Sequence, residues 1–258
     1  MDLSARHYVA VLLLVSTSAT TQLGAQSPVQ PSARPDSVRV GARQAAEYER
    51  LRTDWAGLQT FVKANAELPA PALDEDRVVF MGNSIIELWT PYFDTMFPGK
   101  PYIGRGISGQ TTPQMLVRFR QDVVDLHPKA VMILAGTNDI AGNTGPATLE
   151  MIENNLASMA ELAKANGIRV VMASVLPAYN YSWRPSVQPA SIIVALNQWI
   201  KDYASRTGAV YVDFHSAMVD ERLGLRKDLS ADGVHPDEAG FRVMAPLAEA
   251  AIREALQK

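Results

Sequence analysis

The feature of this sequence that most constrains its fold is an alternation of short apolar runs with long amphipathic stretches. Runs rich in apolar and β-branched residues predict strands at Arg77–Met81, Ala130–Ala135, Arg169–Val175 and Ala209–Val212, with Pro101–Ile103 as a candidate for a further strand. Apolar residues at helical spacing predict helices at Thr112–Leu126, Ala147–Asn166, Ser191–Arg206 and Asp237–Leu256. Pro113 and Pro146 suit helix starts, and Gly167 suits a helix end. This order of elements indicates an α/β fold.

Strands that are apolar throughout and joined by helices form parallel sheets covered on both faces. We therefore expect a three-layer α/β/α, flavodoxin-like domain with a parallel sheet of about five strands. In such sheets the loops after the carboxyl ends of the strands gather in one crevice, where ligands bind. Functional residues are therefore expected directly after strands.

The N-terminus has the pattern of an export signal. Arg6 and His7 precede the apolar run Tyr8–Val15, and small residues lead to Ala25, after which we expect cleavage. A transmembrane anchor is the alternative, but the run is about half of the ~20 residues that a span requires. No cysteine follows to accept a lipid. The mature protein is thus expected to be exported, periplasmic or secreted, without an integral membrane anchor.

The region after the signal divides into two parts. Residues 26–41 are rich in Pro, Ser and Gln and predict a flexible linker. Ala42–Glu67 has apolar residues at helical spacing and predicts a helix packed on the domain, which would occupy residues 42–258.

Composition excludes several classes of function. The 258 residues suffice for one α/β domain, and a net charge of −3 provides no basic surface for nucleic acid or anionic membrane. Cysteine is absent, which excludes disulfides, thiolate metal sites and cysteine nucleophiles. Covalent chemistry would have to come from Ser, Thr, Lys or a carboxylate.

Three segments that follow strands carry candidate site residues. Ser84 stands at a strand-to-helix turn, where it is either an exposed nucleophile or a helix cap. The Gly-rich loop Gly104–Thr112 opens a helix and can present backbone amides to an oxyanion or to a phosphate, although it matches neither nucleotide-binding glycine motif. Asn138 can direct its amide into the crevice or stabilise a turn.

A fourth segment, before the last helix, contains Asp232 and His235. An Asp three residues before a His can accept the Nδ1 proton and leave Nε2 free to take a proton from a serine. A helix-entry turn with a surface histidine is the alternative. Asp213 and His215 form a rival pair, but two residues apart on a strand end their side chains point the same way, and His127 lies in a His-Pro turn.

Together these segments resemble the sequence blocks of the SGNH hydrolases, also called the GDSL family, over roughly Arg77–Leu256. The run through Gly109 and the Asp-Gly-x-His-Pro ending are most similar to lysophospholipase/thioesterase-like and platelet-activating-factor-acetylhydrolase-like members. The resemblance implies that Ser84 is the nucleophile, with Asp232 and His235 completing its triad. It also implies an oxyanion hole formed by the backbone amides of Ser84 and Gly109 and the side-chain amide of Asn138.

One residue departs from the family's pattern. Asn83 stands where the family name implies Asp; it keeps an acceptor oxygen and loses the charge. Because the acid that partners His235 is Asp232, we expect this difference not to abolish catalysis.

The resemblance implies a serine hydrolase that cleaves carboxylic esters through an acyl-enzyme, with no metal or organic cofactor. Glycan O-acetyl groups, short-chain esters, lysophospholipids and thioesters are the candidate substrates, and export favours glycan and lipid esters. Two aromatic groups either rim the acyl or sugar site or pack beneath loops: Tyr179, Tyr181 and Trp183, and Trp89, Phe93 and Phe97. The alternatives are a non-catalytic glycan- or lipid-binding protein on the same fold and a phosphate or nucleotide binder. The sequence assigns no oligomeric state.

Overall fold

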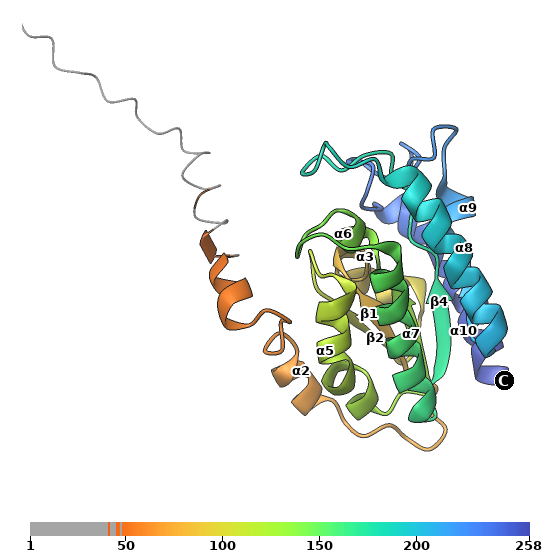
Figure 1. Ribbon diagram of the computed structural model, residues 1–258. Helices are drawn as coiled ribbons and strands as arrows, with labels where there is room; N and C mark the ends of the chain where they lie inside the picture. Colours follow the sequence, from red (N-terminus) through yellow and green to blue (C-terminus); the bar gives the residue numbers. More distant parts are fainter. Residues whose placement is uncertain (1–40, 42–44, 47) are drawn as a thin grey trace, which may run out of the picture. The chain divides into compact units, whose positions relative to one another are not determined.

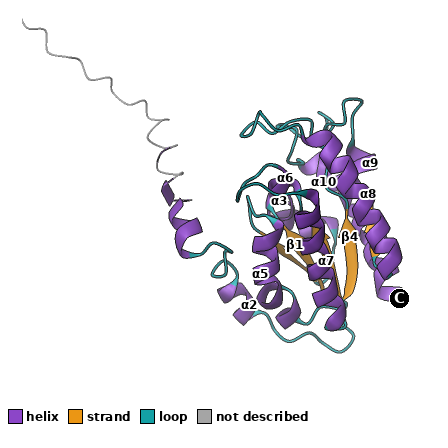
Figure 2. Ribbon diagram, in the orientation of Figure 1, coloured by secondary structure: helices purple, strands orange, loops and turns teal. Residues whose placement is uncertain are grey.

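The centre of the domain is a parallel sheet of five strands, seen in the computed structural model (Figures 1 and 2), which describes residues 41, 45–46 and 48–258. The strands are β1 (Val78–Gly82), β2 (Tyr102–Gly106), β3 (Ala130–Leu134), β4 (Arg169–Ala173) and β5 (Val210–Val212). Their order in the sheet is β2-β1-β3-β4-β5, and each neighbouring pair is parallel. The predicted signal peptide and the linker up to residue 40 lie outside the described residues.

Helices alternate with the strands along the chain. The longer ones are α5 (Thr112–Asp122), α7 (Leu149–Ala165), α8 (Pro189–Thr207) and α10 (Glu238–Gln257). The short elements are α2 (Val62–Glu67), α3 (Ser84–Trp89), η1 (Thr90–Tyr92), α4 (Phe93–Met96), η2 (Val124–Leu126), α6 (Thr137–Ile140) and α9 (Phe214–Met218). The α/β fold and its parallel sheet are confirmed. The second long helix begins at Leu149 after an N-cap at Thr148, so Pro146 precedes it rather than opening it.

Two apolar cores lie on the two faces of the sheet. One contains Phe119 of α5, Leu156 of α7 and Leu196 of α8. The other contains Trp89 of α3 and Phe241 of α10, whose rings stack with centroids 5.6 Å apart. The buried side chains of Phe93 and Phe97 join this second core, so Trp89, Phe93 and Phe97 pack in the interior and do not rim a site.

The register of the sheet aligns the carboxyl ends of β1, β2 and β3. Gly82 of β1 pairs with Gly106 of β2 on one side and with Leu134 of β3 on the other. At Gly106 the backbone passes so close to α3 that an added Cβ would lie 2.6 Å from the carbonyl oxygen of Asn83. Glycine is therefore required there to bring the loop after β2 against the loop after β1.

The segment before β1 differs from the single helix predicted over Ala42–Glu67. Residues 48–53 are helical, residues 55–60 form turns, and a second short helix, α2, follows. The Asp54 carboxylate accepts hydrogen bonds from the amides of Leu58 and Gln59, at 2.7 and 2.9 Å, and Gly57 has a φ of +68°. These side-chain bonds replace helical backbone bonds, so the single-helix prediction was wrong over residues 54–61.

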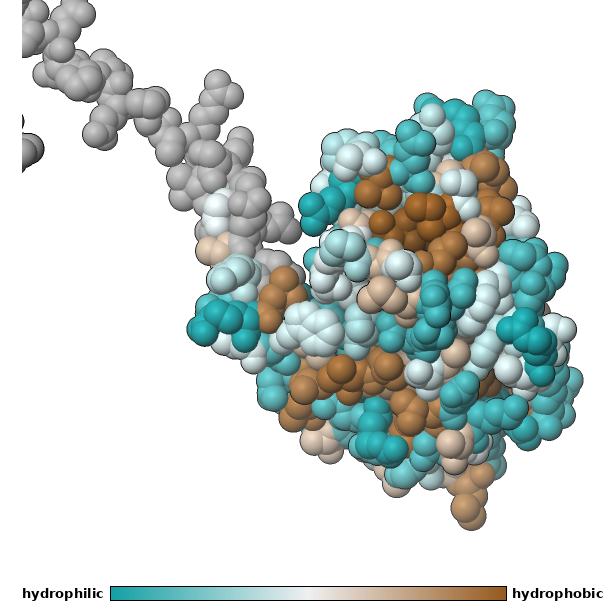
Figure 3. Space-filling model, viewed as in Figure 1, coloured by the Kyte–Doolittle hydropathy of each residue, from teal (hydrophilic) through white to brown (hydrophobic). Residues whose placement is uncertain are grey.

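The surface of the domain mixes hydrophilic and apolar side chains (Figure 3). Exposed large apolar residues on the helices include Val117 of α5, Met151 of α7 and Val194 of α8. Among the described residues, no helix combines the length and apolarity needed to cross a bilayer.

Candidate active site

Ser84 is the first residue of α3, directly beyond the carboxyl end of β1. The helix is capped by Asn83, whose Oδ1 accepts the amide of Ile85 at 3.0 Å. The capping role considered for Ser84 therefore belongs to its neighbour. The hydroxyl of Ser84 instead lies 2.9 Å from Nε2 of His235, and only 7% of Ser84 is exposed.

His235 and Asp232 form one compact turn before α10. Nδ1 of His235 lies 2.7 Å from Oδ2 of Asp232, while Oδ1 of Asp232 accepts the backbone amides of Val234 and His235 at 2.9 and 2.8 Å. Burial raises the pKa of Asp232, but the amide and imidazole of His235 and the amide of Val234 outweigh it and hold the pKa at about 2. The carboxylate is therefore ionised at neutral pH and can hold the imidazole with its proton on Nδ1.

The rival histidines lie in different surroundings. The Asp213 carboxylate accepts the amide and hydroxyl of Ser216 at 2.9 and 2.7 Å and so caps α9. In the described part of the chain, Nε2 of His215 is buried without a hydrogen-bond partner. His127 is exposed in a left-handed conformation after η2. Of the histidines considered, His235 is the one bonded to both a serine and an aspartate.

Two backbone amides of the segments after β1 and β2 have no acceptor within the part of the chain that the structure describes. Neither the amide of Ser84 nor that of Gly109 donates to an acceptor in the described residues. Gly109 is exposed and has a φ of +78°, a conformation that favours glycine. Its loop is held against β1 and α3 because the amide of Ile107 donates to Gly82 O at 3.2 Å and the amide of Ser108 donates to the Glu87 carboxylate.

Asn138 lies in α6, the single helical turn that follows β3. Its side chain is buried, with 4% exposed, and its Nδ2 donates to the carbonyl oxygen of Gln110 at 2.9 Å. The second hydrogen on Nδ2 has no acceptor in the described residues. The side chain therefore joins the loop after β3 to the loop after β2 and keeps a donor available.

Asp139, the next residue, ties the same loop to the start of α5. Both of its oxygens lie 3.0 Å from the amide of Thr112, and the Thr112 hydroxyl also donates to it. Burial raises the pKa of Asp139 to about 6, against the hydrogen bonds from Thr112, which lower it. The sequence did not assign a role to Asp139, and its only signal was its position next to Asn138, directly after a strand.

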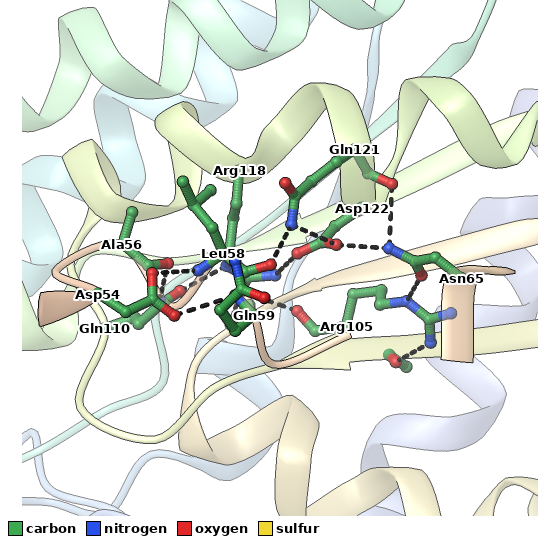
Figure 4. Close-up of polar contacts among 12 residues, drawn as sticks. Asp54, Ala56, Leu58, Gln59, Asn65, Arg105, Gln110, Arg118, Gln121 and Asp122 are labelled. Carbon is green, nitrogen blue, oxygen red and sulfur yellow. Dashed lines mark hydrogen bonds and ion pairs between the residues drawn. The ribbon is translucent and has the colours of Figure 1, made fainter. Parts of the chain in front are cut away.

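A network of buried polar side chains, centred on Arg118 of α5, binds the Gly-rich loop through Gln110 (Figure 4). Arg118 of α5 is fully buried; it donates to Gln110 Oε1 at 2.6 Å, to Asp122 Oδ2 at 3.0 Å and to the carbonyl oxygens of Gly82 and Arg105 at 3.0 and 2.9 Å. One guanidinium thus joins the ends of β1 and β2 to the loop that carries Gly109. Sequence reasoning missed Arg118, because a single arginine within an amphipathic helix carries no signal of burial.

The segment before β1 completes this network. Side-chain amides donate to its backbone carbonyl groups, with Gln110 bonded to Ala56 O at 2.7 Å and Gln121 to Leu58 O at 2.8 Å. Asn65 of α2 donates to Asp122 at 2.8 Å and accepts from Arg105 Nε at 2.9 Å. The segment before β1, which was predicted to pack as a plain helix, is therefore hydrogen-bonded to the buried polar residues that support the Gly-rich loop.

One cavity of the described chain lies away from Ser84 and lacks the side chains of a serine–histidine–aspartate site. A cavity of about 220 Å³ opens at the amino ends of β4 and β5, and its lining includes Lys164, Arg169 and Gly208 but no Ser, His or Asp. Ligands of open parallel sheets bind at the carboxyl ends of strands, where Ser84 lies. Among the described residues, no group of three or more His, Asp or Glu is placed to hold a metal ion.

The fold and the site together define an α/β protein with the arrangement of a serine hydrolase, and the chain belongs to the GDSL-like lipase/acylhydrolase family, whose model matches residues 80–243. It is similar to a GDSL-like lipase of Bacteroides thetaiotaomicron, whose solved structure has a TM-score of 0.76, 44% identity, and coverage of 78% of this chain and 100% of that one. This likeness agrees with the parallel-sheet fold.

Two curated relatives carry activities in their names. Esterase TesA of Pseudomonas aeruginosa is 30% identical over 138 residues, which are 52% of this chain and 60% of TesA. An acetylxylan esterase of Xylanibacter ruminicola is 26% identical over 221 residues, which are 72% of this chain and 45% of that protein. In both cases the matched region covers less than two thirds of the relative.

Proposed function

We propose that this protein is a serine esterase that hydrolyses carboxylic esters through an acyl-enzyme on Ser84. The observation that carries the proposal is the continuous hydrogen-bonded chain from Ser84 Oγ to His235 Nε2, at 2.9 Å, and from His235 Nδ1 to Asp232, at 2.7 Å. A serine in hydrogen-bond contact with a histidine that is oriented by a carboxylate is the arrangement that activates a hydroxyl nucleophile.

Acylation follows from this arrangement. Ser84 Oγ attacks the ester carbonyl carbon while its proton passes to His235 Nε2. The resulting oxyanion accepts from the amides of Ser84 and Gly109 and from Nδ2 of Asn138. When the intermediate collapses, the bond to the alcohol oxygen breaks and the alcohol leaves with the proton from His235. Ser84 then carries the acyl group.

Deacylation repeats the sequence with water as the nucleophile. Water gives its proton to His235 and attacks the acyl carbon, and the same three donors hold the second oxyanion. Collapse breaks the bond to Ser84 Oγ, which takes the proton back, and the carboxylic acid leaves. Asp232 stays ionised throughout and stabilises the imidazolium formed in both steps.

For the substrate, we propose esters with a short acyl group, the O-acetyl groups of glycans being the favoured class. Trp89, Phe93 and Phe97 fill the core behind α3, and Tyr181 is buried with its hydroxyl 2.7 Å from that of Thr137, so these rings are not free to line a long acyl channel. Tyr179 and Trp183 remain exposed on the loop after β4. Similarity to an acetylxylan esterase supports the same class.

We also propose that the protein is exported, with residues 1–25 as a cleaved signal peptide. The pattern of basic, apolar and small residues supports this, as does the 33% identity over 78 residues to the uncharacterized lipoprotein YqeF of Bacillus subtilis. N-terminal sequencing of the protein recovered from outside the cytoplasmic membrane would test the cleavage site after Ala25.

The deciding experiment is mass spectrometry after treatment with a fluorophosphonate probe, beside turnover of p-nitrophenyl acetate, butyrate and longer esters. We expect labelling at Ser84, fastest turnover of acetate, and loss of both in Ser84→Ala. Asn138→Ala should lower kcat by roughly 10² to 10³, the usual effect of removing one oxyanion donor. A folded protein that is neither labelled nor active would instead favour the non-catalytic glycan- or lipid-binding alternative.

A further inference from the structure

Asn143, a residue outside the segments considered above, contacts both loops of the oxyanion site. It lies in the turn after α6, between Gly142 and Gly145, which have φ values of +72° and +113°. Its backbone amide donates to Asn138 O at 3.0 Å, which places its side chain beside that of Asn138.

The side chain of Asn143 makes three hydrogen bonds. Its Nδ2 donates to Asn138 Oδ1 at 3.1 Å and to Gly109 O at 3.2 Å. Its Oδ1 accepts from Nε1 of Trp183 at 3.2 Å. Asn143 therefore bonds to two of the three residues assigned to the oxyanion hole, through the side-chain oxygen of Asn138 and the carbonyl oxygen of Gly109, and to Trp183, which is 40% exposed.

These bonds determine which way each amide points. The indole N–H of Trp183 can only donate, so Asn143 must turn its oxygen to Trp183 and its NH₂ group to the other two partners. Asn138 must then turn its oxygen to Asn143 and its NH₂ group to Gln110 O, which can only accept. The reverse orientation of either amide would set donor against donor and oxygen against oxygen.

We propose that Asn143 is a positioning residue for ester hydrolysis and that Trp183 determines its orientation. Asn143 holds Asn138 with a free N–H directed to the oxyanion, and its bond to Gly109 O fixes the Gly109–Gln110 peptide, the peptide directly after the Gly109 amide. This inference rests on the proposed function, because it assigns a role in the same oxyanion hole. Neither Asn143 nor Trp183 needs to contact the reacting atoms for this role.

The test is steady-state hydrolysis of p-nitrophenyl acetate by the full mature protein. Asn143→Ala should lower kcat about tenfold and leave KM within about twofold, a smaller loss than the roughly 10² to 10³ expected for Asn138→Ala because the donor itself remains. Asn143→Asp should lower kcat about 100-fold, because a carboxylate cannot donate to Asn138 and draws the Asn138 NH₂ group toward itself. Trp183→Phe, which keeps a ring but loses the N–H, should lower kcat about threefold.

Two matched variants serve as controls. Asn166→Ala removes an exposed amide that bonds to Leu162 O at the far end of α7, and Trp199→Phe changes a tryptophan that stacks on Tyr203 of α8. Both should keep the wild-type kcat. Thermal unfolding of every variant identifies any loss of folded protein, and rates are compared per folded molecule by titration with the fluorophosphonate probe.

A double-mutant cycle separates positioning from a merely structural role. If Asn143 acts mainly through Asn138, Asn143→Ala should cost less than about threefold in an Asn138→Ala background. Full additivity, a wild-type kcat in Asn143→Ala, or a milder effect of Asn143→Asp than of Asn143→Ala would overturn the proposal. Ser84→Ala in the same assay tests the proposed function separately: active wild type with inactive Ser84→Ala upholds that function whatever the Asn143 variants do.

Discussion

The two sides of Ser84 are built in different ways. On the side of the base, Asp232 and His235 belong to one short turn, and the Asp232 side chain is 52% exposed. On the side of the proposed oxyanion donors, Gly109 and Asn138 come from segments after different strands and are held by bonds to Gln110, Asn143 and, through Gln110, buried Arg118. The base is thus organised by local hydrogen bonds, whereas the donor side requires the assembled sheet.

The carboxylates on the two sides show the same contrast. Burial raises the pKa of both, but the amides and imidazole around Asp232 outweigh burial and hold its pKa at about 2, whereas the pKa of buried Asp139 reaches about 6. The ionised form of Asp232 is favoured by folding, and that of Asp139 is disfavoured. Because the bonds of Asp232 lie within one exposed turn, whereas those of the donor side join separate buried elements, changes on the base side should alter mainly the rate and changes on the donor side should also alter stability.

The largest expected effect is that of Asp232→Asn on the rate. The amide oxygen can still accept the backbone amides, but its NH₂ group faces His235 Nδ1 and forces the tautomer that carries its proton on Nε2. That tautomer cannot take the Ser84 proton, so we expect kcat to fall by about 10⁴, as for the equivalent change in a serine protease triad. Steady-state kinetics measures this; a loss below tenfold would show that Asp232 does not orient His235. Because folding favours the ionised Asp232 carboxylate, Asp232→Asn should also lower the unfolding temperature at neutral pH, but only modestly, since the side chain is 52% exposed.

Arg118→Met should have the largest effect on stability. The change leaves the fully buried Asp122 carboxylate without its cation and removes the bonds to Gly82 O and Arg105 O. Breaking a buried ion pair from one side typically costs about 3 to 5 kcal/mol in the free energy of unfolding, which urea denaturation would measure.

A matched exposed pair provides the control for Arg118. Arg242 and Glu238 on α10 are also a helical pair four residues apart, with side chains 60% and 52% exposed. Arg242→Met should cost no more than about 1 kcal/mol. Similar losses for the two variants would contradict the claim that the donor side depends on its buried network.

Asp139→Asn should change how stability depends on pH. The pKa of Asp139 is about 6 in the folded protein, above the ordinary value of 3.8. Between these two pH values the folded protein binds more protons than the unfolded protein, so the free energy of unfolding falls as the pH rises from one to the other. The wild type should therefore lose up to roughly 3 kcal/mol relative to Asp139→Asn between about pH 4 and pH 7. Urea denaturation across this range tests it; a constant difference between the two proteins would contradict it.

Asn83→Asp should have the smallest effect. A carboxylate can accept the amide of Ile85 as Asn83 Oδ1 does, and negative charge is favourable at a helix N-terminus. The Asn83 Nδ2 that it replaces is buried without a partner in the described residues. We expect kcat within one decade of the wild type, about 1.4 kcal/mol in activation free energy. A greater loss in steady-state assays would mean that the turn before Ser84 is tuned to the neutral amide.

Most of the α/β architecture could be predicted from apolar periodicity. Each of the strand segments proposed from the sequence overlaps a strand of the sheet, with the edges shifted by a few residues. The segment before β1 could not be predicted in this way, because its turns are made by Asp54 and by glutamine side chains from α5 and the Gly-rich loop. Periodicity records which residues face the core, not which backbone groups a distant side chain binds.

The residues of the site also divide into those found from local sequence patterns and those found only in the tertiary structure. The sequence by itself determined the candidate residues Ser84, Asp232 and His235, because a strand-to-helix turn and an Asp-x-x-His pair are local patterns. Only the tertiary structure decided that Arg118, Asp139 and Asn143 support the donor side, since their partners lie on other elements of the fold. The physical reason is that a hydrogen bond specifies distance and direction between two groups, and for groups far apart in sequence both are set by packing.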